Sequence, residues 1–426
     1  MPKKPTAKVV EDAIAALDTV RREWLRRPGV TAVDVGYKIK DDALTDDVAV
    51  RVHVERKVAP AELAKTEVFN ESGKAVKKLK GFPIDVIEAT YVPSTAPIAL
   101  EDDDALQAID RKTAIDPLIG GISCGNPRVT AGTLGAIVFD RASCKPMILS
   151  NWHILAGSSS AAVGEDILQP GRIDGGTDVV ASLTKMRLDS RMDAAVATLN
   201  GSRRHSRDIL GLGAIRGMDT ATLGMNVVKS GRTTGITEGV VDGVSLSTAI
   251  NYGDPGVVSF SNQIRIVPRA PWPAVNYEVS QGGDSGSVWL NEANDRAIGL
   301  HFAGERNPAP SAENAICSPI QPIATELNFS FLPVLCYPKL KIPPIRLIPH
   351  FWHLCRRYPW LCGPPWVPVK PPFPFPDPPP FGGRFGPFGG GFPGAGGEAG
   401  SGGCGCSEGF DAEEYARALA EFGEEY

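Results

Sequence analysis

Apolar and polar positions follow two different periods in the first part of the chain. Apolar residues recur every three or four positions between residues 10 and 26, which predicts a helix that ends before Pro28 and Gly29. The period then becomes two. Valine and other apolar residues occupy every second position of residues 33–39 and again of residues 48–54, and this alternation predicts two strands with one apolar face each.

The same N-terminal region continues with a short helix expected near Pro60 and a strand expected over residues 82–92. Together these elements predict a small α+β domain over residues 1–92, in which we find no catalytic motif. His53 lies on the strand face opposite the valines, where a surface or sheet-packing role is expected. Residues 93–117 are polar and acidic and are interpreted as a linker.

Short β-type segments separated by Gly, Asn and Asp turns fill residues 118–330. Long helical patterns are scarce there, so a β-barrel or β-sandwich is expected rather than alternating strands and helices. The expected strands cover residues 133–139, 146–150, 194–199, 226–230, 239–246, 263–267 and 297–302.

The composition of the chain changes after residue 330. Residues 331–407 are rich first in proline and aromatic residues and then in glycine, so they are expected to form a disordered low-complexity tail. An alternative is that this tail binds a protein partner through its aromatic residues. Residues 408–426 are expected to form a short acidic amphipathic helix that begins at a capping box made by Asp411 and Glu414.

Composition narrows the possible functions. The net charge is −5 at pH 7, which does not support nucleic-acid binding, and no apolar run of about 18 residues indicates a transmembrane helix. The eight cysteines form no paired zinc pattern, and neither a metal nor another cofactor is expected. No apolar signal segment follows the charged start, so a cytoplasmic protein with reduced thiols is predicted, with export by another route left open. Cys124 and Cys144 flank the first expected strand and are accordingly expected to be buried free thiols, and the alternative is that they lie adjacent in space.

A serine stands within a glycine-rich turn at Gly282-Gly283-Asp284-Ser285-Gly286. Glycines allow a tight turn that points backbone N–H groups inward. A serine hydroxyl beside such groups can attack a carbonyl carbon while the N–H groups stabilise the resulting oxyanion. Loops rich in these residues are common, so the turn indicates catalysis only if the chain also offers a base and an acid that orients the base.

His153 is the best candidate base, because a predicted strand runs into it and an apolar turn follows. Asp193 opens an apolar strand, where burial can hold a carboxylate against an imidazole, and Asp189 on the same approach is the alternative acid. The chain order is therefore His153, Asp193, Ser285. This order, and the absence of a glycine two residues after the serine, exclude an α/β-hydrolase.

His, Asp and Ser in this order, with Gly-Asp-Ser-Gly at the serine, resemble the trypsin-like (chymotrypsin-fold) serine peptidases. Residues 132–138, 149–153 and 228–235 are similar to the bacterial and plant narrow-leaf-type group of this family. Three departures from the family pattern are Trp152 before the histidine, the absence of a cysteine after it and the absence of an obvious activation cleavage site. The resemblance implies an all-β fold of two six-stranded barrels over residues 118–330.

The resemblance also implies a role for each residue. Ser285 would be the nucleophile, His153 would take its proton and pass it to the leaving amine, and Asp193 would hold the imidazole tautomer. The N–H groups of Gly283 and Ser285 would form the oxyanion hole. The strand at residues 300–304 would pair with the substrate backbone.

The turn and its surroundings suggest further roles. Asp284 is interpreted as a structural group that shapes the turn, while Val279, His301 and Ala303 are expected to line the substrate pocket. The setting of His301 resembles the Gly-x-His-x-x-Gly of relatives that cleave after Glu or Gln, and an imidazole there can donate to a carboxylate or an amide. The alternative is a histidine satisfied by its neighbours. Val279 carries no charge, which argues against selection of Lys or Arg.

These observations predict a serine endopeptidase that cleaves protein or peptide substrates through an acyl-enzyme intermediate. The alternative is a binding or scaffold module of the same fold, in which the N-terminal domain and the tail are the working surfaces. A further hypothesis is that the N-terminal domain or the tail gates the cleft, because both are attached without an evident catalytic purpose.

Overall fold

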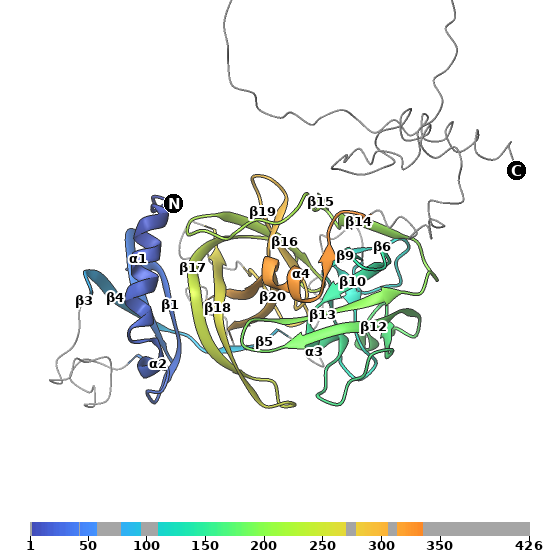
Figure 1. Cartoon of the computed structure of the whole chain (residues 1–426), viewed down its shortest axis with the longest axis horizontal. Helices are drawn as coiled ribbons and strands as arrows, with labels where there is room; N and C mark the ends of the chain where they lie inside the picture. The colour runs from blue at the N-terminus through green and yellow to red at the C-terminus, as the bar shows by residue number, and fades with distance from the viewer. Residues whose placement is uncertain are drawn as a thin grey trace, which may run out of the picture. The chain divides into compact units, whose positions relative to one another are not determined.

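The computed structural model describes residues 2–41, 43–57, 78–94, 110–269, 278–305 and 313–334, all of which belong to one compact unit. Most of its regular structure is β-strand, in agreement with the predicted class (Figure 1). Within these residues, every helix is too short or too polar to cross a membrane. The helix expected near Pro60, the low-complexity tail beyond residue 334 and the final acidic helix lie outside the described residues.

The N-terminal region begins with two helices where one is predicted. They are α1 (Ala7–Asp18) and α2 (Arg21–Trp24). Thr6 caps α1, with its hydroxyl oxygen accepting a hydrogen bond from the N–H of Val9. The prediction of one continuous helix is wrong at Thr19, whose hydroxyl donates to the carbonyl of Ala16 at 2.7 Å and competes with the helical hydrogen bonds there.

Five strands follow these helices. They are β1 (Val30–Lys40), β2 (Ala43–Val54), β3 (Lys78–Leu79), β4 (Phe82–Glu88) and β5 (Tyr91–Pro93). The first two form an antiparallel pair with Val33 opposite Val52, and β4 runs parallel to β2. The single strand expected over residues 82–92 is therefore two strands, because β5 parts from β4 and pairs with β20 (Arg296–Glu305), a distant strand of the same sheet.

The N-terminal strands continue a sheet of the remainder of the chain. β1 pairs antiparallel with β17 (Gly235–Asn251), with Ala32 opposite Thr248. Figure 1 shows β1 lying between α1 and β17. The valine face of β1 and β2 packs with Leu17 of α1 in one apolar cluster, so α1 covers this face of the sheet.

A buried network of charged side chains lies on the face opposite the valines. Arg51 donates to Asp34 at 2.7 Å and to Asp242 of β17 at 2.6 Å, and all three side chains are fully buried. Burial alone would raise the pKa of Asp34, but the charge of Arg51, together with the influence of His53 and the hydrogen bonds from both residues, outweighs burial and holds this pKa well below its ordinary value. His53 is also fully buried, with its ring nitrogens hydrogen-bonded to Asp34 and Tyr91. The network joins the N-terminal strands to β17.

The first half of residues 110–334 contains a sheet of six strands in the order β11-β12-β13-β10-β9-β22. The elements of this half are β6 (Leu118–Gly120), β7 (Ile122–Cys124), β8 (Gly132–Leu134), β9 (Ala136–Asp140), β10 (Pro146–Ser150), α3 (Trp152–Leu155), β11 (Asp166–Leu168), the 3-10 helix η1 (Arg172–Asp174), β12 (Val179–Leu188), β13 (Asp193–Leu199), β14 (His205–Ile209), β15 (Gly213–Ala214) and, from the far end of the chain, β22 (Phe329–Ser330).

The second half forms a closed barrel. Besides β17, its elements are β16 (Asn226–Gly231), β18 (Val257–Pro268), β19 (Val288–Asn291), β20 (Arg296–Glu305), β21 (Ala315–Pro319) and α4 (Ile320–Glu326). Its strands pair in the order β16-β19-β20-β21-β18-β17, and β16 also pairs with β17, which closes the ring. Every strand expected between residues 118 and 330 overlaps an observed one.

The cysteines of the described residues differ in whether they form a disulfide bond. Cys124 is a buried free thiol as expected, and so is Cys317, and burial raises the pKa of both. Cys144 is disulfide-bonded, so the expectation of a free thiol is wrong at this position. Disulfide pairing depends on which cysteines the fold brings together, so the local sequence around Cys144 does not predict it.

Replacing Arg51 tests the buried network. Arg51→Leu leaves Asp34 and Asp242 without their shared cation, and removal of one partner from a buried ion pair costs about 3–5 kcal/mol. Denaturant-induced unfolding should show a loss of this size. Arg56→Leu removes an exposed arginine of the same region and should change the free energy of unfolding by less than about 0.5 kcal/mol. Equal effects of the two substitutions would contradict a stabilising role for the network.

Candidate active site

Glycines shape the serine turn that precedes β19. Gly283 and Gly286 have positive φ values of 102° and 97°, which glycine adopts without strain. A Cβ on Gly286 would lie 2.2 Å from Ser150 Oγ, so this glycine also permits the close approach of the turn to β10. Ser285 lies between these constraints and is fully buried.

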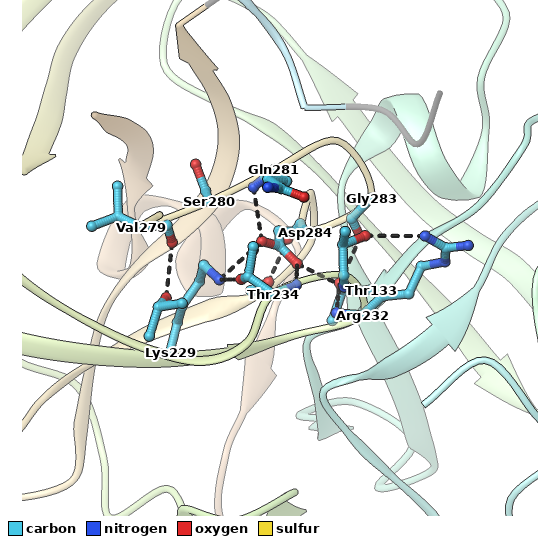
Figure 2. Close-up of polar contacts among 12 residues, drawn as sticks. Thr133, Lys229, Arg232, Thr234, Val279, Ser280, Gln281, Gly283 and Asp284 are labelled. Atoms are coloured by element: carbon cyan, nitrogen blue, oxygen red, sulfur yellow. Dashed lines mark hydrogen bonds and ion pairs between the residues drawn. The ribbon is translucent and has the colours of Figure 1, made fainter. Parts of the chain in front are cut away.

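Asp284 anchors the turn inside the second barrel (Figure 2). Its Oδ1 accepts hydrogen bonds from the backbone N–H groups of Thr233 at 2.9 Å and Thr234 at 3.1 Å. Its Oδ2 accepts from the Thr234 hydroxyl at 2.6 Å, from the N–H of Gln281 at 3.0 Å and from Nζ of Lys229 at 3.1 Å. These contacts match the structural role that the sequence suggests for Asp284.

These partners keep the Asp284 carboxylate ionised. Burial would raise its pKa, but the charge of Lys229 and the hydrogen bonds lower it to about 2. Burial also lowers the pKa of the Lys229 ammonium group, and Asp284 opposes that change. Residues 228–235, one of the three stretches that resemble the peptidase family, contain the Asp284 partners Lys229, Thr233 and Thr234. This stretch therefore binds the Asp284 carboxylate.

His153 and Asp193 meet at one end of the strand pair β10–β13. These strands are antiparallel, α3 begins two residues after β10, and Asp193 is the first residue of β13. Nδ1 of His153 is hydrogen-bonded to Oδ2 of Asp193, and the backbone N–H of His153 donates to Oδ1 at 3.2 Å. The structure therefore brings together the base and the acid selected from the sequence. Asp189, the alternative acid, is paired with Arg191 instead.

A tyrosine of the second barrel joins this pair. Tyr252 follows β17 directly, and its hydroxyl donates to Oδ2 of Asp193 at 2.7 Å. Its ring centroid lies 5.8 Å from that of His153. Burial, together with the charge of Asp193, raises the pKa of Tyr252 well above its ordinary value, so the hydroxyl keeps its proton and donates. No local sequence signal marks Tyr252, because its position depends on the packing of the two halves.

Ser285 is tied to the same region through the backbone. The N–H of Thr133 donates to the carbonyl of Ser285 at 2.8 Å, and the Ser150 hydroxyl donates to the carbonyl of Thr133 at 2.7 Å. The Ser285 hydroxyl itself donates to the carbonyl of Phe302 at 3.3 Å. Nε2 of His153 is buried and has no hydrogen-bond partner among the described residues. A side-chain rotation of Ser285 must therefore precede a hydrogen bond to Nε2.

The N–H of Gly283 holds a carbonyl oxygen of the chain itself. It donates to the carbonyl of Ser94 at 2.7 Å, and the N–H of Ser94 donates to the carbonyl of Phe302 at 3.1 Å. Ser94 follows β5, which pairs antiparallel with β20. The strand that was expected to bind the substrate backbone is therefore paired with residues 91–94 of the chain itself. Nothing in the local sequence, which reads as the end of a strand and the start of a linker, indicates this placement.

The three residues expected to line the pocket are all fully buried, but their surroundings differ. Val279 packs in the same apolar cluster as Trp289, and Ala303 belongs to a second cluster. The ring of His301 meets the Trp289 ring edge-on, with 6.4 Å between centroids, and neither of its nitrogens is hydrogen-bonded within the described residues. Burial, followed by the charge of Lys229, lowers the pKa of His301 to about 3, so the imidazole is neutral near pH 7.

Three glutamates that the sequence patterns did not single out lie close to Val279. Glu313 is buried and accepts hydrogen bonds from the N–H groups of Val279 at 2.8 Å and Ser280 at 3.3 Å. Burial and the neighbouring charge of Glu305 raise the pKa of Glu313 to about 10. Burial also raises the pKa values of Glu278 and Glu305. Glu313 therefore carries a proton near pH 7, and its carboxyl group is hydrogen-bonded to Glu305.

Comparison with known proteins finds similarity at the level of structure. No protein-family model and no curated protein matches the chain. Thermobifida fusca protease A is similar over 50% of this chain and 97% of its own, with 19% identity and a TM-score of 0.38. A chymotrypsin of Cellulomonas bogoriensis is similar over 51% and 99%, with 17% identity and a TM-score of 0.36. A glutamic acid specific serine protease that uses a histidine triad in substrate binding is similar over 50% and 99%, with 21% identity and a TM-score of 0.37.

Asp284→Asn should remove a pH-dependent part of the stability. The folded-state pKa of Asp284 is lowered to about 2, so its ionisation stabilises the fold fully above the unfolded-state pKa of about 3.9. This contribution, about 2–3 kcal/mol, is lost as the pH falls toward 2. Unfolding measured between about pH 6 and about pH 3 should therefore depend more steeply on pH in the wild type than in Asp284→Asn. Asp208→Asn, which alters an exposed carboxylate of β14, should follow the wild type. Parallel curves for the wild type and Asp284→Asn would contradict this assignment.

Proposed function

We propose that the protein is a serine endopeptidase that hydrolyses peptide bonds through an acyl-enzyme intermediate on Ser285. The observation that carries this proposal is the buried pair of His153 and Asp193. The carboxylate binds Nδ1 and the backbone N–H of the histidine, while Nε2 has no partner in the described part of the chain. This arrangement favours the tautomer with its proton on Nδ1, so that Nε2 can accept a proton from a serine hydroxyl.

The reaction follows from these positions. Ser285 rotates away from the carbonyl of Phe302, and His153 takes its proton as Oγ attacks the substrate carbonyl carbon. The same nitrogen then protonates the leaving amine as the C–N bond breaks. Water, deprotonated by His153, hydrolyses the ester and restores Ser285. Asp193 stabilises the imidazolium through its hydrogen bond to Nδ1, and Tyr252 positions Asp193 through its hydroxyl.

The N–H groups of Gly283 and Ser285 are assigned to oxyanion stabilisation. In support, the N–H of Gly283 already donates to a peptide carbonyl oxygen, that of Ser94, at 2.7 Å. This distance lies within the range expected for a donor to an oxyanion. The buried contacts of Asp284 hold the turn that presents both N–H groups, so the donors need not reorganise during the reaction.

The pocket is proposed to prefer Glu or Gln before the cleaved bond. His301 is neutral and fully buried, and its unpaired ring N–H can donate to a carboxylate or amide oxygen. Glu313, whose carboxyl group is hydrogen-bonded to Glu305 and to the N–H of Val279, lies beside Val279 of this pocket. Because Glu278 and Glu305 also lie near this site, an uncharged Gln is favoured over an ionised Glu as the pH rises and these acids lose their protons.

A fluorophosphonate reagent tests the nucleophile, because it bonds covalently to an activated serine hydroxyl. The wild type should be labelled at Ser285, as located by mass spectrometry, and Ser285→Ala should not be labelled. Asp193→Asn should lower peptide hydrolysis by about 10⁴-fold, since the histidine loses its correct tautomer. Ser206→Ala, on β14, is the control and should be labelled like the wild type. Resistance to labelling in both the folded wild type and the folded Tyr91→Phe variant, whose segment on β20 is loosened, would favour the binding-module alternative.

Cleavage of a peptide library tests the pocket. Glu and Gln should be enriched before the cut, and His301→Ala should lower kcat/KM for such peptides by about 10- to 100-fold, because the buried substrate group loses a hydrogen bond. His205→Ala, which removes an exposed histidine of β14, should leave the profile unchanged. An unaltered profile in His301→Ala would rule out this role for His301.

A further inference from the structure

Residues 91–94 lie along β20 as a bound peptide would. β5 pairs antiparallel with β20, with Val92 opposite Gly304. The N–H of Ser94 continues this ladder by donating to the carbonyl of Phe302 at 3.1 Å. Pairing of an extended segment with a strand is a common way for proteins to bind peptides, because the main chain supplies the hydrogen bonds.

Ser94 occupies the place of the residue before a cleaved bond. Its carbonyl oxygen accepts the N–H of Gly283 at 2.7 Å, in the proposed oxyanion hole. A Cβ built on Gly304 would lie 3.5 Å from Ser94 Oγ and 3.3 Å from Ser280 Oγ, so the two hydroxyls approach the same point of β20. Both Ser94 and Ser285 are buried. The hydrogen bonds of Ser94 to Gly283 and Phe302 thus place its carbonyl on the turn that carries Ser285, two residues before the serine.

The N-terminal strands hold this segment in place. Tyr91 is buried beside Phe302 in an apolar cluster, and its hydroxyl is hydrogen-bonded to His53. His53 is in turn bonded to Asp34 of the buried charged network, which is joined to β17. The segment therefore binds as part of the same molecule and loses no translational freedom, which raises its effective concentration far above that of a free peptide.

We propose that residues 91–94 are a substrate segment carried by the chain itself, and that the peptide bond after Ser94 is a self-cleavage site. This inference rests on the proposed function, since Ser285 makes the cut. While the segment is bound, other peptides cannot use β20 or the N–H of Gly283. The Ser94 side chain is shorter than the Glu or Gln proposed for other substrates. It therefore lacks their hydrogen bond to His301, and self-cleavage is expected to be slow.

The proposed step is an ordinary hydrolysis. Oγ of Ser285 bonds to the carbonyl carbon of Ser94, its proton moves to Nε2 of His153, and the bond to the nitrogen of residue 95 breaks. The departing amine takes the proton from Nε2. Water then adds to the ester carbonyl, releases Ser285 and leaves a carboxyl group on Ser94. The products are residues 1–94 and the chain that starts at residue 95.

Intact-mass measurements on the full chain test this inference. Wild type and Ser285→Ala are incubated near pH 7 at two protein concentrations that differ by about tenfold. A fragment that ends at Ser94 should accumulate in the wild type at a rate independent of concentration, and none should form in Ser285→Ala. A tagged Ser285→Ala chain mixed with wild type should stay uncut at this bond. Fluorophosphonate labelling of the same samples reports the reactivity of Ser285 separately.

Substitutions in the segment provide a second readout. Ser94→Pro lacks the N–H that donates to Phe302 and should abolish the cut. Tyr91→Phe loses the hydroxyl that bonds to His53, which loosens the segment, so it should slow the cut and accelerate labelling of Ser285 by about 2- to 10-fold. Tyr37→Phe removes the hydroxyl of another buried tyrosine and is the matched control, with neither rate expected to change.

The outcomes separate this inference from the proposed function. A wild-type chain that is labelled at Ser285 yet stays uncut after Ser94 would overturn self-cleavage and leave the peptidase assignment in place. A chain that is neither labelled nor cut would overturn both. Cleavage of the tagged Ser285→Ala chain, or of Ser285→Ala alone, would overturn the intramolecular step, because another molecule would then make the cut.

Discussion

The buried carboxylate of Asp284 is the constraint on which the candidate site depends. It accepts three backbone N–H groups, one hydroxyl and the ammonium group of Lys229, all in a region from which water is excluded. Hydrogen bonds to a charged group are strong, and an unpaired charge at this depth would be very costly. The carboxylate therefore fixes the turn around it, and with the turn it fixes Ser285 and the N–H of Gly283. Asp284 and Lys229 both belong to the second barrel, so the folding of that barrel fixes the conformation of the serine turn.

The two halves of residues 110–334 supply different parts of the site. His153 and Asp193 come from the first half, while Tyr252 and Ser285 come from the second. Tyr252 reaches across to the carboxylate of Asp193, and Thr133 reaches across to the carbonyl of Ser285. Relative movement of the halves would thus break hydrogen bonds at the acid and at the nucleophile together, which couples the packing of the halves to the geometry of the site.

The N-terminal region is coupled to the same site through the sheet. β1 extends the second barrel at β17, and the network around Arg51 buries charges of both regions together. Because β5 follows these strands closely in the chain, the place where they dock also decides where residues 91–94 lie. The stability of the N-terminal strands and the occupancy of β20 are consequently linked, since Tyr91 contacts the network and the cleft strand alike.

Local patterns predicted the strands well, because alternate burial depends on each residue and its nearest neighbours. They failed at Thr19, where a side-chain hydrogen bond ends the helix, and at residues 89 and 90, where one expected strand becomes two. His153, Asp193 and Ser285 were found from their chain order and settings. Tyr252, Glu313 and Ser94 were not found, because each acts through a contact with a residue far away in the sequence.

Short stretches of sequence were enough to predict the β-rich class, the candidate base, acid and nucleophile, and the glycines that the serine turn requires, since periodicity and residue chemistry are local properties. The three-dimensional fold was needed to show that Asp193 rather than Asp189 meets His153, that Lys229 pairs with Asp284, and that the Ser94 carbonyl accepts the N–H of Gly283. These pairings follow from the register and closure of sheets, which depend on the burial of many distant side chains at once.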